Sequence, residues 1–388
     1  MSKVNTAAMD KQNLTAIGLM SGTSLDGVDA ALVHTDGEAH VKTAQHIFRA
    51  YTDEERAVLV ETMRQAVKWN FVGPSPNIFA KAEDIVDAAH VDAITSLLAK
   101  TDTQDIDLIG YHGQTVLHHA AIQGQGQGQG QKGATLQIGR GQALADEFGI
   151  PTAYDFRSND VSVGGQGAPL APVYHKALVM AAGLSGNTAV INIGGVSNVT
   201  VVVADGNIAA SDCGPGNGPL DSWVSQNGLG EYDKDGVLSL RGTPDIARLE
   251  GWLKRPFFLK NVPKSADRYD FDVLSTMHGM SIDNGAATLS MFCALAIQNT
   301  LNQYHQAIEN IVVCGGGRHN PAIIAALTEA LSTRVINCDD LGWDGDALEA
   351  QAFAYMAVRH KKRLPLSFPS TTGVSNPVTG GVLATPNK

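Results

Sequence analysis

The chain contains the same strand, turn and strand pattern twice. Residues 18–33 read as an apolar strand, a polar tip with Ser-Gly-Thr-Ser and Asp-Gly, and a second apolar strand. Residues 188–206 repeat this order around Gly-Gly-Val-Ser-Asn and close on another Asp-Gly. Each half later carries an amphipathic helix and a strand that ends in glycine, at 82–115 and 288–320. The repeat predicts two duplicated α/β domains that face each other across a cleft.

The length of the chain also indicates two domains, because 388 residues exceed what one hydrophobic core usually supports. We predict a first domain of residues 14–150 with 352–388, and a second domain of residues 151–351. Residues 1–13 form an N-terminal extension in this interpretation. The Gln-Gly run at 123–133 has low complexity and cannot bury a core, so it is predicted to be a loop between two strands.

Composition excludes several classes of partner. The formal charge is -11 and Lys and Arg form no cluster, which argues against a nucleic-acid or anionic membrane surface. The first thirteen residues lack the apolar segment of a signal peptide, and 18 consecutive apolar residues occur nowhere. The four cysteines lack the spacing of a metal site or a disulfide framework, which favours buried free thiols. We therefore expect a cytoplasmic protein that binds neither nucleic acid nor membrane.

The residues at the two hairpin tips suit an oxygen-rich ligand. Glycine allows a ligand to approach the main chain closely, so such tips can present N–H groups and hydroxyls to a polyphosphate. One tip alone would be interpreted as an ordinary turn, but its repetition favours phosphate binding. The chain has no P-loop and no kinase H-R-D segment, so a nucleotide would be held by the hairpins. The tip residues predicted to bind ATP are Gly22, Thr23, Ser24, Asp26, Gly27, Gly194, Gly195, Ser197 and Asn198.

Hairpin pairs of this kind resemble the phosphate-binding elements of the superfamily of actin, heat-shock chaperone ATPases and sugar kinases. Within that superfamily, seven segments in this order and spacing resemble the 1,6-anhydro-N-acetylmuramic acid kinase family of bacterial cell-wall recycling, over roughly residues 15–380. The extension and the Gln-Gly run depart from the family pattern. The segments are GLMSGTSLDGVD, GYHGQT, DFRSNDVSVGGQGAPLAP, INIGGVSNV, DCGPGNGPLDSW, PKSADRYDF and CGGGRHN.

This resemblance implies a fold of two actin-like, ribonuclease H-like ATPase domains. It implies that ATP phosphorylates O6 of the anhydrosugar while water opens the 1,6-anhydro bridge, which gives N-acetylmuramic acid 6-phosphate and ADP. It also implies a homodimer, and it adds Gly315, Gly316 and Gly317 as the turn that contacts the adenosine. The reaction needs a base for the water, an acceptor in line with O6, and Mg²⁺ to neutralise phosphate charge.

The resemblance makes Asp212 the catalytic base. Gly214, Pro215 and Gly216 follow it, and we expect them to turn the chain away just after a strand and leave the carboxylate at the cleft. Turn statistics alone fit a helix N-cap or turn-forming residue equally well. Glu349 is the second residue predicted to be catalytic; it opens a helix and, by resemblance, points at the sugar. Its alternative role is to stabilise the helix dipole.

Four residues are predicted to bind the sugar. Gln114 and Thr115 end the strand in YHGQT, and Arg157 and Asp160 lie in DFRSND. Asp155 and Asp160 flank Arg157, so either carboxylate could instead pair with the guanidinium.

The sequence predicts few protein ligands for a metal ion and no metal-binding histidine. His118 and His119 have no Cys or Glu at ligand spacing, so we expect no metal site there. Mg²⁺ would be held by phosphate oxygens and water, with Asp26 as the nearest carboxylate. His112 is interpreted as a core histidine ahead of a sugar ligand.

Two other functions stay open. A nucleotide-independent glycoside hydrolase could use Asp212 and Glu349 as its pair of carboxylates, although it has no use for two phosphate-type tips. An inactive sensor or scaffold would require a damaged motif, and all the quoted segments are intact.

Overall fold

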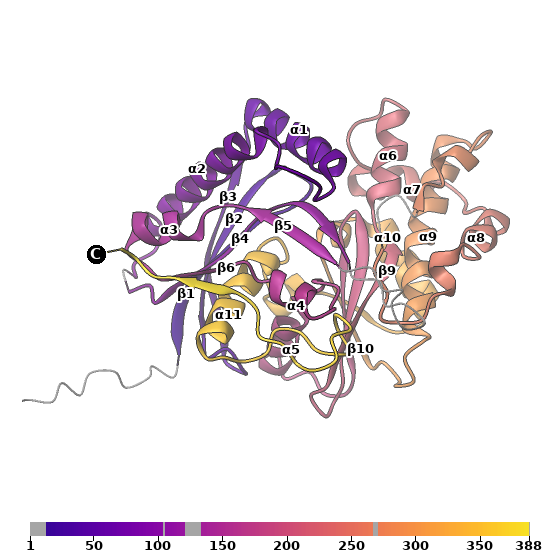
Figure 1. Ribbon diagram of the computed structural model, residues 1–388. Helices are drawn as coiled ribbons and strands as arrows, with labels where there is room; N and C mark the ends of the chain where they lie inside the picture. The colour runs from indigo at the N-terminus through magenta and orange to yellow at the C-terminus, as the bar shows by residue number, and fades with distance from the viewer. Residues whose placement is uncertain (1–12, 104, 121–132, 267–270, 388) are drawn as a thin grey trace, which may run out of the picture. The chain divides into compact units, whose positions relative to one another are not determined.

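The computed structural model describes residues 13–103, 105–120, 133–266 and 271–387. The Gln-Gly repeats, nearly all of the N-terminal extension and four residues of PKSADRYDF lie outside these ranges. Cα packing divides the chain into two compact units (Figure 1). Unit 1 comprises the chain up to Ala181 together with the chain from Ala347 onward, and unit 2 is Ala182–Asp346.

The sheet of unit 1 has the order β12-β6-β4-β1-β2-β3, with β5 paired to β4. β1, β2 and β3 are antiparallel neighbours, whereas β4 runs parallel to β1 and β6 runs parallel to β4. The opening hairpin predicted at 18–33 is therefore confirmed as β1 and β2. The strands are β1 (Leu14–Ser21), β2 (Gly27–Thr35), β3 (Val41–Ala50), β4 (Leu108–His119), β5 (Ala134–Ile138), β6 (Thr152–Tyr154) and β12 (Val382–Ala384).

Helices cover both faces of this sheet, which explains why β1 is apolar along almost its whole length. α1 and α2 bury Ile17, Leu19 and the even positions of β2, and α11 packs on the opposite face (Figure 1). Thr52 and Glu55 form a capping box at the start of α1. The helices are α1 (Asp53–Trp69), α2 (Ile78–Leu98), α3 (Gly141–Phe148), α4 (Ser158–Ser162), α5 (Pro172–Ala181) and α11 (Leu348–Lys361).

α11 approaches the sheet at a distance that only glycine permits. Gly18 of β1 and Gly110 of β4 are register partners in adjacent strands. A Cβ at Gly18 would overlap the carbonyl oxygen of Ala350 and the amide of Ala354, and a Cβ at Gly110 would overlap the carbonyl oxygen of Phe353. The two glycines therefore form the surface on which α11 lies.

Unit 2 repeats the strand order of unit 1. Its sheet is β11-β10-β7-β8-β9, in which β7, β8 and β9 are antiparallel and β10 and β11 run parallel to β7 and β10. This order matches β6-β4-β1-β2-β3 strand for strand, so the predicted duplicated α/β architecture is confirmed. The strands are β7 (Thr188–Ile193), β8 (Val196–Val202), β9 (Ile208–Pro215), β10 (Asn310–Cys314) and β11 (Val335–Asn337).

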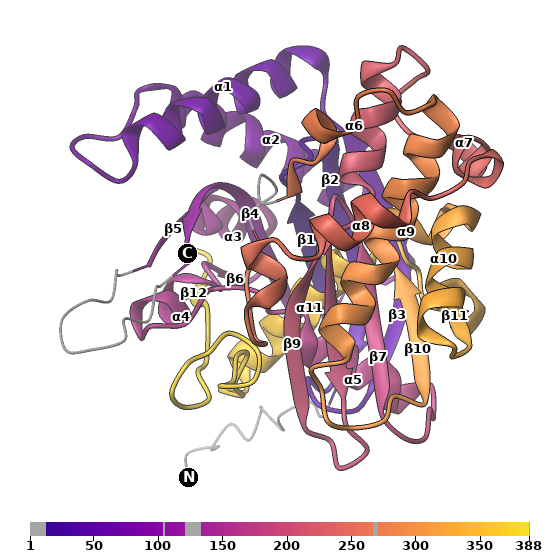
Figure 2. The same ribbon diagram turned by 90° about the vertical axis from the view of Figure 1, so that its right-hand side faces the viewer.

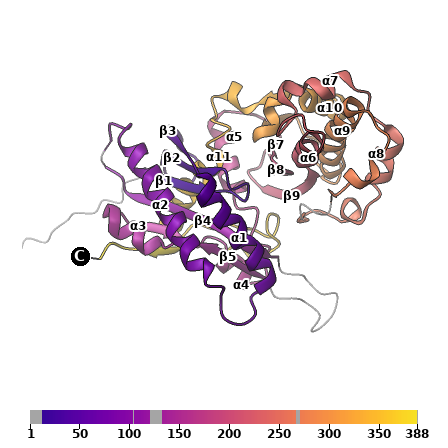
Figure 3. The same cartoon turned by 90° about the horizontal axis from the view of Figure 1, so that it is seen from above.

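The core of unit 2 lies between one face of this sheet and a layer of helices. α9 runs along the sheet and buries Phe292, Ala296 and Ile297 against Ile191 and Cys213 (Figure 2). Figure 3 shows the helices of this unit gathered on one side of β7, β8 and β9. The helices are α6 (Gly218–Gln226), α7 (Val237–Arg241), α8 (Ile246–Trp252), α9 (Ile282–Leu301) and α10 (Pro321–Leu331), with short 3-10 turns η1 (Lys234–Gly236), η2 (Pro256–Leu259), η4 (Leu274–Thr276), η5 (Gly316–His319) and η6 (Cys338–Leu341).

The unit boundaries differ from the predicted ones. Unit 1 extends past residue 150 to Ala181, because β6 pairs with β4 and α5 contacts α11. Unit 1 also resumes at Ala347, five residues before the predicted 352, so the whole of α11 belongs to it. Arg157, Asp160 and Glu349 thus lie in unit 1 instead of the second domain.

All four cysteines are buried free thiols, as predicted. Among the described residues, no helix is both long and apolar enough to cross a bilayer.

The contact between α11 and the sheet can be tested by adding one methyl group. We expect Gly18→Ala to lower the free energy of unfolding by about 3 kcal/mol, because the new Cβ would push α11 off β1. Gly251→Ala is the matched control, since nothing lies within 4 Å of its added Cβ. Urea unfolding followed by circular dichroism measures both. A wild-type midpoint for Gly18→Ala would contradict this packing.

Candidate active site

The tip between β1 and β2 is short and largely exposed. Leu25 donates its amide to the carbonyl of Gly22 at 3.2 Å, which closes the turn. Leu25 has a φ of 56° and is only 3% exposed, so its buried side chain holds a strained backbone in place. Thr23 and Ser24 are consequently presented to solvent.

Asp26 is also exposed at this tip. Its Oδ1 accepts the Ser24 hydroxyl at 2.7 Å and the Gly27 amide at 3.0 Å, so both hydrogen bonds use one oxygen. Gly27 itself is buried, and a Cβ there would overlap the carbonyl oxygen of Arg49 on β3. Packing of β3 thus accounts for Gly27, whereas the second carboxylate oxygen of Asp26 has no hydrogen-bond partner among the described residues.

The tip between β7 and β8 is smaller than predicted, because β8 begins at Val196. Only Gly194 and Gly195 remain in the turn, and Gly195 is exposed with nothing within 4 Å of an added Cβ. The amides of residues 216–218 donate to the two tip carbonyls at 2.8 to 3.3 Å. The GPGNG segment therefore fixes this tip.

Ser197 and Asn198 are residues of β8 and not of the tip. Ser197 is fully buried, and its hydroxyl donates to the carbonyls of Gly214 and Pro215. Asn198 is half-buried on the opposite face of the strand.

A polar row crosses the sheet of unit 2 at the level of Asn198. Asn192 of β7 is the register partner of Asn198, which in turn is the partner of Asp212 on β9. Paired residues share one sheet face, and this face is opposite to the one that carries Ile191 and Cys213 in the core. Sequence reasoning missed Asn192, although an asparagine near the end of the apolar strand TAVINI was the available signal.

Asp212 lies within β9, which continues to Pro215, rather than just after the strand. The N-cap of α6 is Asn217, so the N-cap alternative for Asp212 is excluded. Its Oδ2 accepts the amide of Ala266 at 2.8 Å, and its own amide donates to the carbonyl of Lys264 at 3.0 Å. Desolvation raises the pKa of Asp212 to about 6, although the Ala266 amide partly opposes the shift. Asp212 is therefore a fixed carboxylate that titrates near neutral pH.

The glycine turn after β10 has one open position. A Cβ at Gly315 would overlap Asn192 Oδ1, and one at Gly317 would overlap the side chain of Ile193. Gly315 also has a φ of 76°. Gly316 is exposed and has nothing within 4 Å of an added Cβ, so a ligand could approach the main chain there.

Arg318 holds this turn, and the sequence interpretation missed it. Its guanidinium donates to the carbonyl of Gly315 at 3.1 Å and pairs with Asp339 at 3.0 Å and Asp346 at 2.9 Å. The Arg318 side chain is only 3% exposed, whereas the side chains of Asp339 and Asp346 are 43% and 65% exposed. Solvent therefore screens the two ion pairs on the carboxylate side. An arginine directly after three glycines was the available signal.

Gln114 is fully buried in unit 1. Its Oε1 accepts the Ser21 hydroxyl at 2.5 Å, and Ser21 also bonds Tyr51 at 2.9 Å. These bonds tie β4 to β1 and leave Gln114 little capacity for a sugar. Thr115 is half-buried, and its hydroxyl accepts from Gln137 at 3.1 Å.

Arg157 is half-buried and bound to two acceptors of unit 1. Its Nε donates to His112 Nε2 at 3.1 Å and its Nη1 donates to the carbonyl of Gly167 at 2.8 Å. Asp155 accepts from Ser158 instead. The two flanking carboxylates considered as partners therefore do not hydrogen-bond Arg157, which leaves the guanidinium charge available.

Asp160 uses both carboxylate oxygens inside the protein. Oδ1 accepts the amide of Gly167 at 2.6 Å and Oδ2 accepts the hydroxyl of Thr372 at 2.6 Å. The residue is 1% exposed, and Gly165 packs so closely that a Cβ there would overlap the carboxylate. Asp160 thus fixes the loop whose Gly167 carbonyl accepts from Arg157.

Glu349 lies in the first turn of α11, and its side chain remains accessible to solvent although the surrounding protein partly desolvates the carboxylate. Desolvation raises the pKa of Glu349, the charge of Arg157 lowers it, and the carboxylates of Asp29 and Asp26 raise it further. Glu349 therefore shares an electrostatic environment in unit 1 with Arg157 and the β1–β2 tip. The position of Glu349 in the first turn of the helix also fits its alternative role, which is to stabilise the helix dipole.

No group of three His, Cys, Asp or Glu side chains that could hold a metal occurs among the described residues. The open oxygen of Asp26 fits a cation that takes its other ligands from phosphate and water. Binding of Mg²⁺ at Asp26 stays a prediction.

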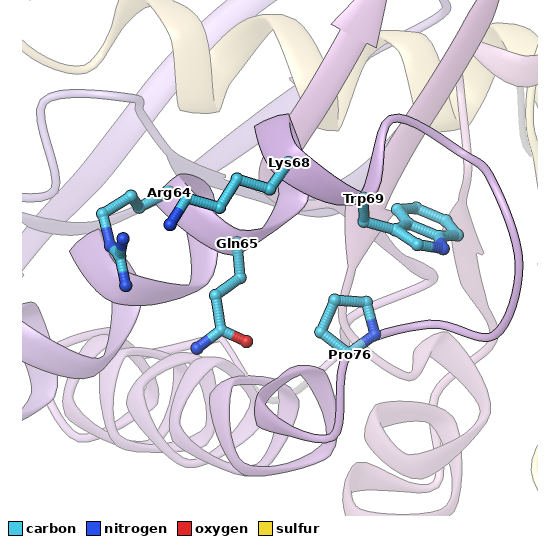
Figure 4. Close-up of a pocket in the computed structure, with 5 residues that line it drawn as sticks. All are labelled: Arg64, Gln65, Lys68, Trp69 and Pro76. Atoms are coloured by element: carbon cyan, nitrogen blue, oxygen red, sulfur yellow. The ribbon is translucent and has the colours of Figure 1, made fainter.

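A surface hollow on α1 is separate from these residues. Arg64, Gln65, Lys68, Trp69 and Pro76 line it (Figure 4). The guanidinium of Arg64 is paired with Glu61 at 2.6 Å, and Trp69 donates to the carbonyl of Gly73. A second hollow, between α7, α9 and α10 in unit 2, also contains none of the predicted site residues.

Comparison with known proteins identifies the class of protein as a kinase of an amino-sugar derivative. The family model described as anhydro-N-acetylmuramic acid kinase matches residues 14–386, so the chain belongs to that family. A relative of this name from Rhizobium rhizogenes is 45% identical over 372 residues, covering 95% of this chain and 98% of its own length. Another from Methylorubrum extorquens is 43% identical over 383 residues, covering 96% and 99%.

Two of the solved structures that match this chain are remote in sequence. Component A of (R)-2-hydroxyglutaryl-CoA dehydratase from Acidaminococcus fermentans aligns with 89% of this chain and 99% of its own, at 15% identity and a TM-score of 0.46. A ROK family glucokinase from Streptomyces griseus, in complex with glucose and AMPPNP, gives 10% identity and a TM-score of 0.40 over 88% and 99%. Similarity this low carries no argument about the site.

The internal role of Asp160 predicts a stability defect. We expect Asp160→Asn to lower the free energy of unfolding by about 1–2 kcal/mol, because a neutral amide has one acceptor oxygen in place of two and makes weaker hydrogen bonds than a carboxylate. Asp155→Asn is the matched control, since Asp155 accepts through one oxygen and its φ of 53° suits asparagine. Urea unfolding compares them, and equal stability of the two variants would refute the internal role.

Proposed function

We propose that the protein is an ATP-dependent kinase that opens the 1,6-anhydro ring of 1,6-anhydro-N-acetylmuramic acid and phosphorylates O6. The products would be N-acetylmuramic acid 6-phosphate and ADP. The observation that carries the proposal is Asp212, a carboxylate held by the Ala266 amide with its pKa raised to about 6. A general base whose pKa lies near the operating pH is ionised in a large fraction of molecules and still binds a proton strongly enough to remove it from water.

Asp212 would take a proton from water as the water oxygen bonds to C1 of the sugar. The C1–O6 bond breaks in the same process, and O6 takes the γ-phosphoryl group of ATP. ADP leaves, so every bond that breaks is matched by one that forms. The γ-phosphoryl group then has the role that a second carboxylic acid plays in a simple glycosidase, where it protonates the leaving oxygen.

Arg157, Glu349 and Thr115 are the residues of unit 1 that we propose for the sugar. Arg157 has a guanidinium free of carboxylate hydrogen bonds, Glu349 is exposed, and the Thr115 hydroxyl is half-buried. The charge of Arg157 favours ionised Glu349. We assign Asp160 and Gln114 a supporting role, because their polar atoms are engaged within the protein.

The phosphates of ATP would bind at the exposed tip positions Thr23, Ser24 and Gly195, and Gly316 would offer open main chain to the nucleoside. Gly22, Gly194, Asn198 and Gly315 remain proposed neighbours of the nucleotide, whereas Gly27, Ser197 and Gly317 would act through packing. Asp26 would hold Mg²⁺, which neutralises phosphate charge when bound. The proposed setting is peptidoglycan recycling in the cytoplasm, with the protein as a homodimer.

The proposal predicts ADP formation that requires the anhydrosugar. Incubation with ATP, Mg²⁺ and 1,6-anhydro-N-acetylmuramic acid should yield ADP and the sugar 6-phosphate in equal amounts. Coupled spectrophotometry and mass spectrometry measure the two products. ADP at the same rate without sugar would indicate only an ATPase, and ring opening without ATP would favour the glycoside hydrolase.

Removal of the base should slow turnover without preventing nucleotide binding. We expect Asp212→Asn to lower kcat by about 10² to 10⁴, the range of a positioned acid-base group. Only ionised Asp212 can accept the proton, so wild-type kcat should fall as pH drops through about 6. This fall in kcat, the acidic limb of the pH profile, should be absent in Asp212→Asn.

Asp221→Asn is the matched control for that pH profile. Burial also raises the pKa of Asp221 to about 6, so it is a competing origin of the limb. Persistence of the limb in Asp212→Asn and its loss in Asp221→Asn would remove Asp212 from the role of base.

A further inference from the structure

The position of one proton on His112 follows from its hydrogen bonds. The ring lies on β4, is 4% exposed, and packs against Phe353 with a centroid distance of 4.7 Å. Nδ1 lies 2.8 Å from the carbonyl oxygen of Gly113. A carbonyl oxygen can only accept, so Nδ1 carries the hydrogen.

The other nitrogen of His112 consequently offers a lone pair. Nε2 lies 3.1 Å from Arg157 Nε, which always carries a hydrogen and can only donate. Arg157 Nη1 donates to the carbonyl of Gly167 at 2.8 Å. These two bonds fix the plane of the guanidinium, and they leave Nη2 without a hydrogen-bond partner among the described residues.

We propose that His112 is a positioning residue that acts through Arg157. The neutral ring, protonated on Nδ1, holds the guanidinium so that Nη2 is directed to the ligand. This inference rests on the proposed function, in which Arg157 binds the anhydrosugar. It replaces the interpretation of His112 as a simple core histidine.

The Arg157 Nε–H restricts which side chain can lie at the position of His112. An imidazolium would set a second positive charge against Arg157, and a ring protonated on Nε2 would set two donors against each other. An apolar ring would fill the volume but leave the Arg157 Nε–H unpaired in a desolvated position. Only a neutral acceptor at the Nε2 position satisfies the guanidinium.

A second histidine of β4, His118, supports the loop that contains Gly167. His118 Nε2 lies 2.9 Å from the carbonyl of Gln166, so its hydrogen is on Nε2, and its Nδ1 accepts the Thr135 hydroxyl at 3.0 Å. Gln166 directly precedes Gly167. His118 thus fixes the residue beside Gly167, while His112 contacts Arg157 directly, and the two are neutral rings of opposite tautomer on one strand.

Three variants test the proposal by sugar binding at equilibrium. His112→Phe keeps a ring against Phe353 but removes the acceptor, and His112→Gln restores an oxygen near the position of Nε2. His90→Phe is the matched control, because His90 is a buried histidine that packs against Tyr111, on the opposite face of β4.

Isothermal titration with 1,6-anhydro-N-acetylmuramic acid should show about tenfold weaker binding for His112→Phe, since a hydrogen bond to a charged group is involved. His112→Gln should recover most of the affinity, and His90→Phe should bind like the wild type. ATP affinity should stay unchanged in all three. Wild-type sugar affinity in His112→Phe, or no recovery in His112→Gln at equal thermal stability, would overturn the proposal.

Nitrogen-15 NMR of the His112 ring at pH 7 gives a readout that does not depend on activity. We expect the neutral form with hydrogen on Nδ1, and an imidazolium or an Nε2-protonated ring would overturn the proposal. Failure of the proposed function is distinguishable, because the wild type would then bind the sugar without phosphorylating it while the His112 variants still changed affinity.

Discussion

The close approach of α11 to β1 and β4 is the contact on which unit 1 depends. Gly18 and Gly110 are register partners, and the backbone of α11 occupies the space where their side chains would be. The alanines Ala347 and Ala350 continue this contact against Ala31 of β2. Because α11 is the last helix of the chain, the packing also brings the C-terminal part back to the first strands. The first turn of α11, with Glu349, is thereby set beside the strands that carry the β1–β2 tip.

In each unit, the polar residues proposed for function are supported by buried polar groups. Asp160 and Thr372 hold the loop that presents Gly167, and Gly167 and His112 hold Arg157. In unit 2 the Ala266 amide holds Asp212, and Arg318 holds the glycine turn. Each of these groups is thus held in place by at least one hydrogen bond to a neighbouring residue. Such preorganisation lets a site stabilise developing charge without reorganising at the moment of reaction.

The sequence predicted what depends on local pattern. Alternating apolar residues with glycine between them are local signals, and both hairpins and the duplicated order of elements are confirmed. The packing units differ from the predicted domains because β6 has only three residues and joins unit 1 through pairing with β4, far away in the chain. The internal role of Asp160 depends on Thr372, 212 residues away, which no local pattern reveals. Asn192 was missed because its significance arises only when β7, β8 and β9 align it with Asp212.

The coupling of ring opening to phosphoryl transfer is tested most directly by the fate of water oxygen. The reaction should be run in ¹⁸O-water with ATP and the anhydrosugar, and the product examined by NMR and mass spectrometry before it mutarotates. If Asp212 activates water that attacks C1 from the face opposite the bridge, the label should lie on the anomeric oxygen of an initially α product and be absent from the phosphate ester. Label in released inorganic phosphate, or an initially β product, would contradict the proposed coupling.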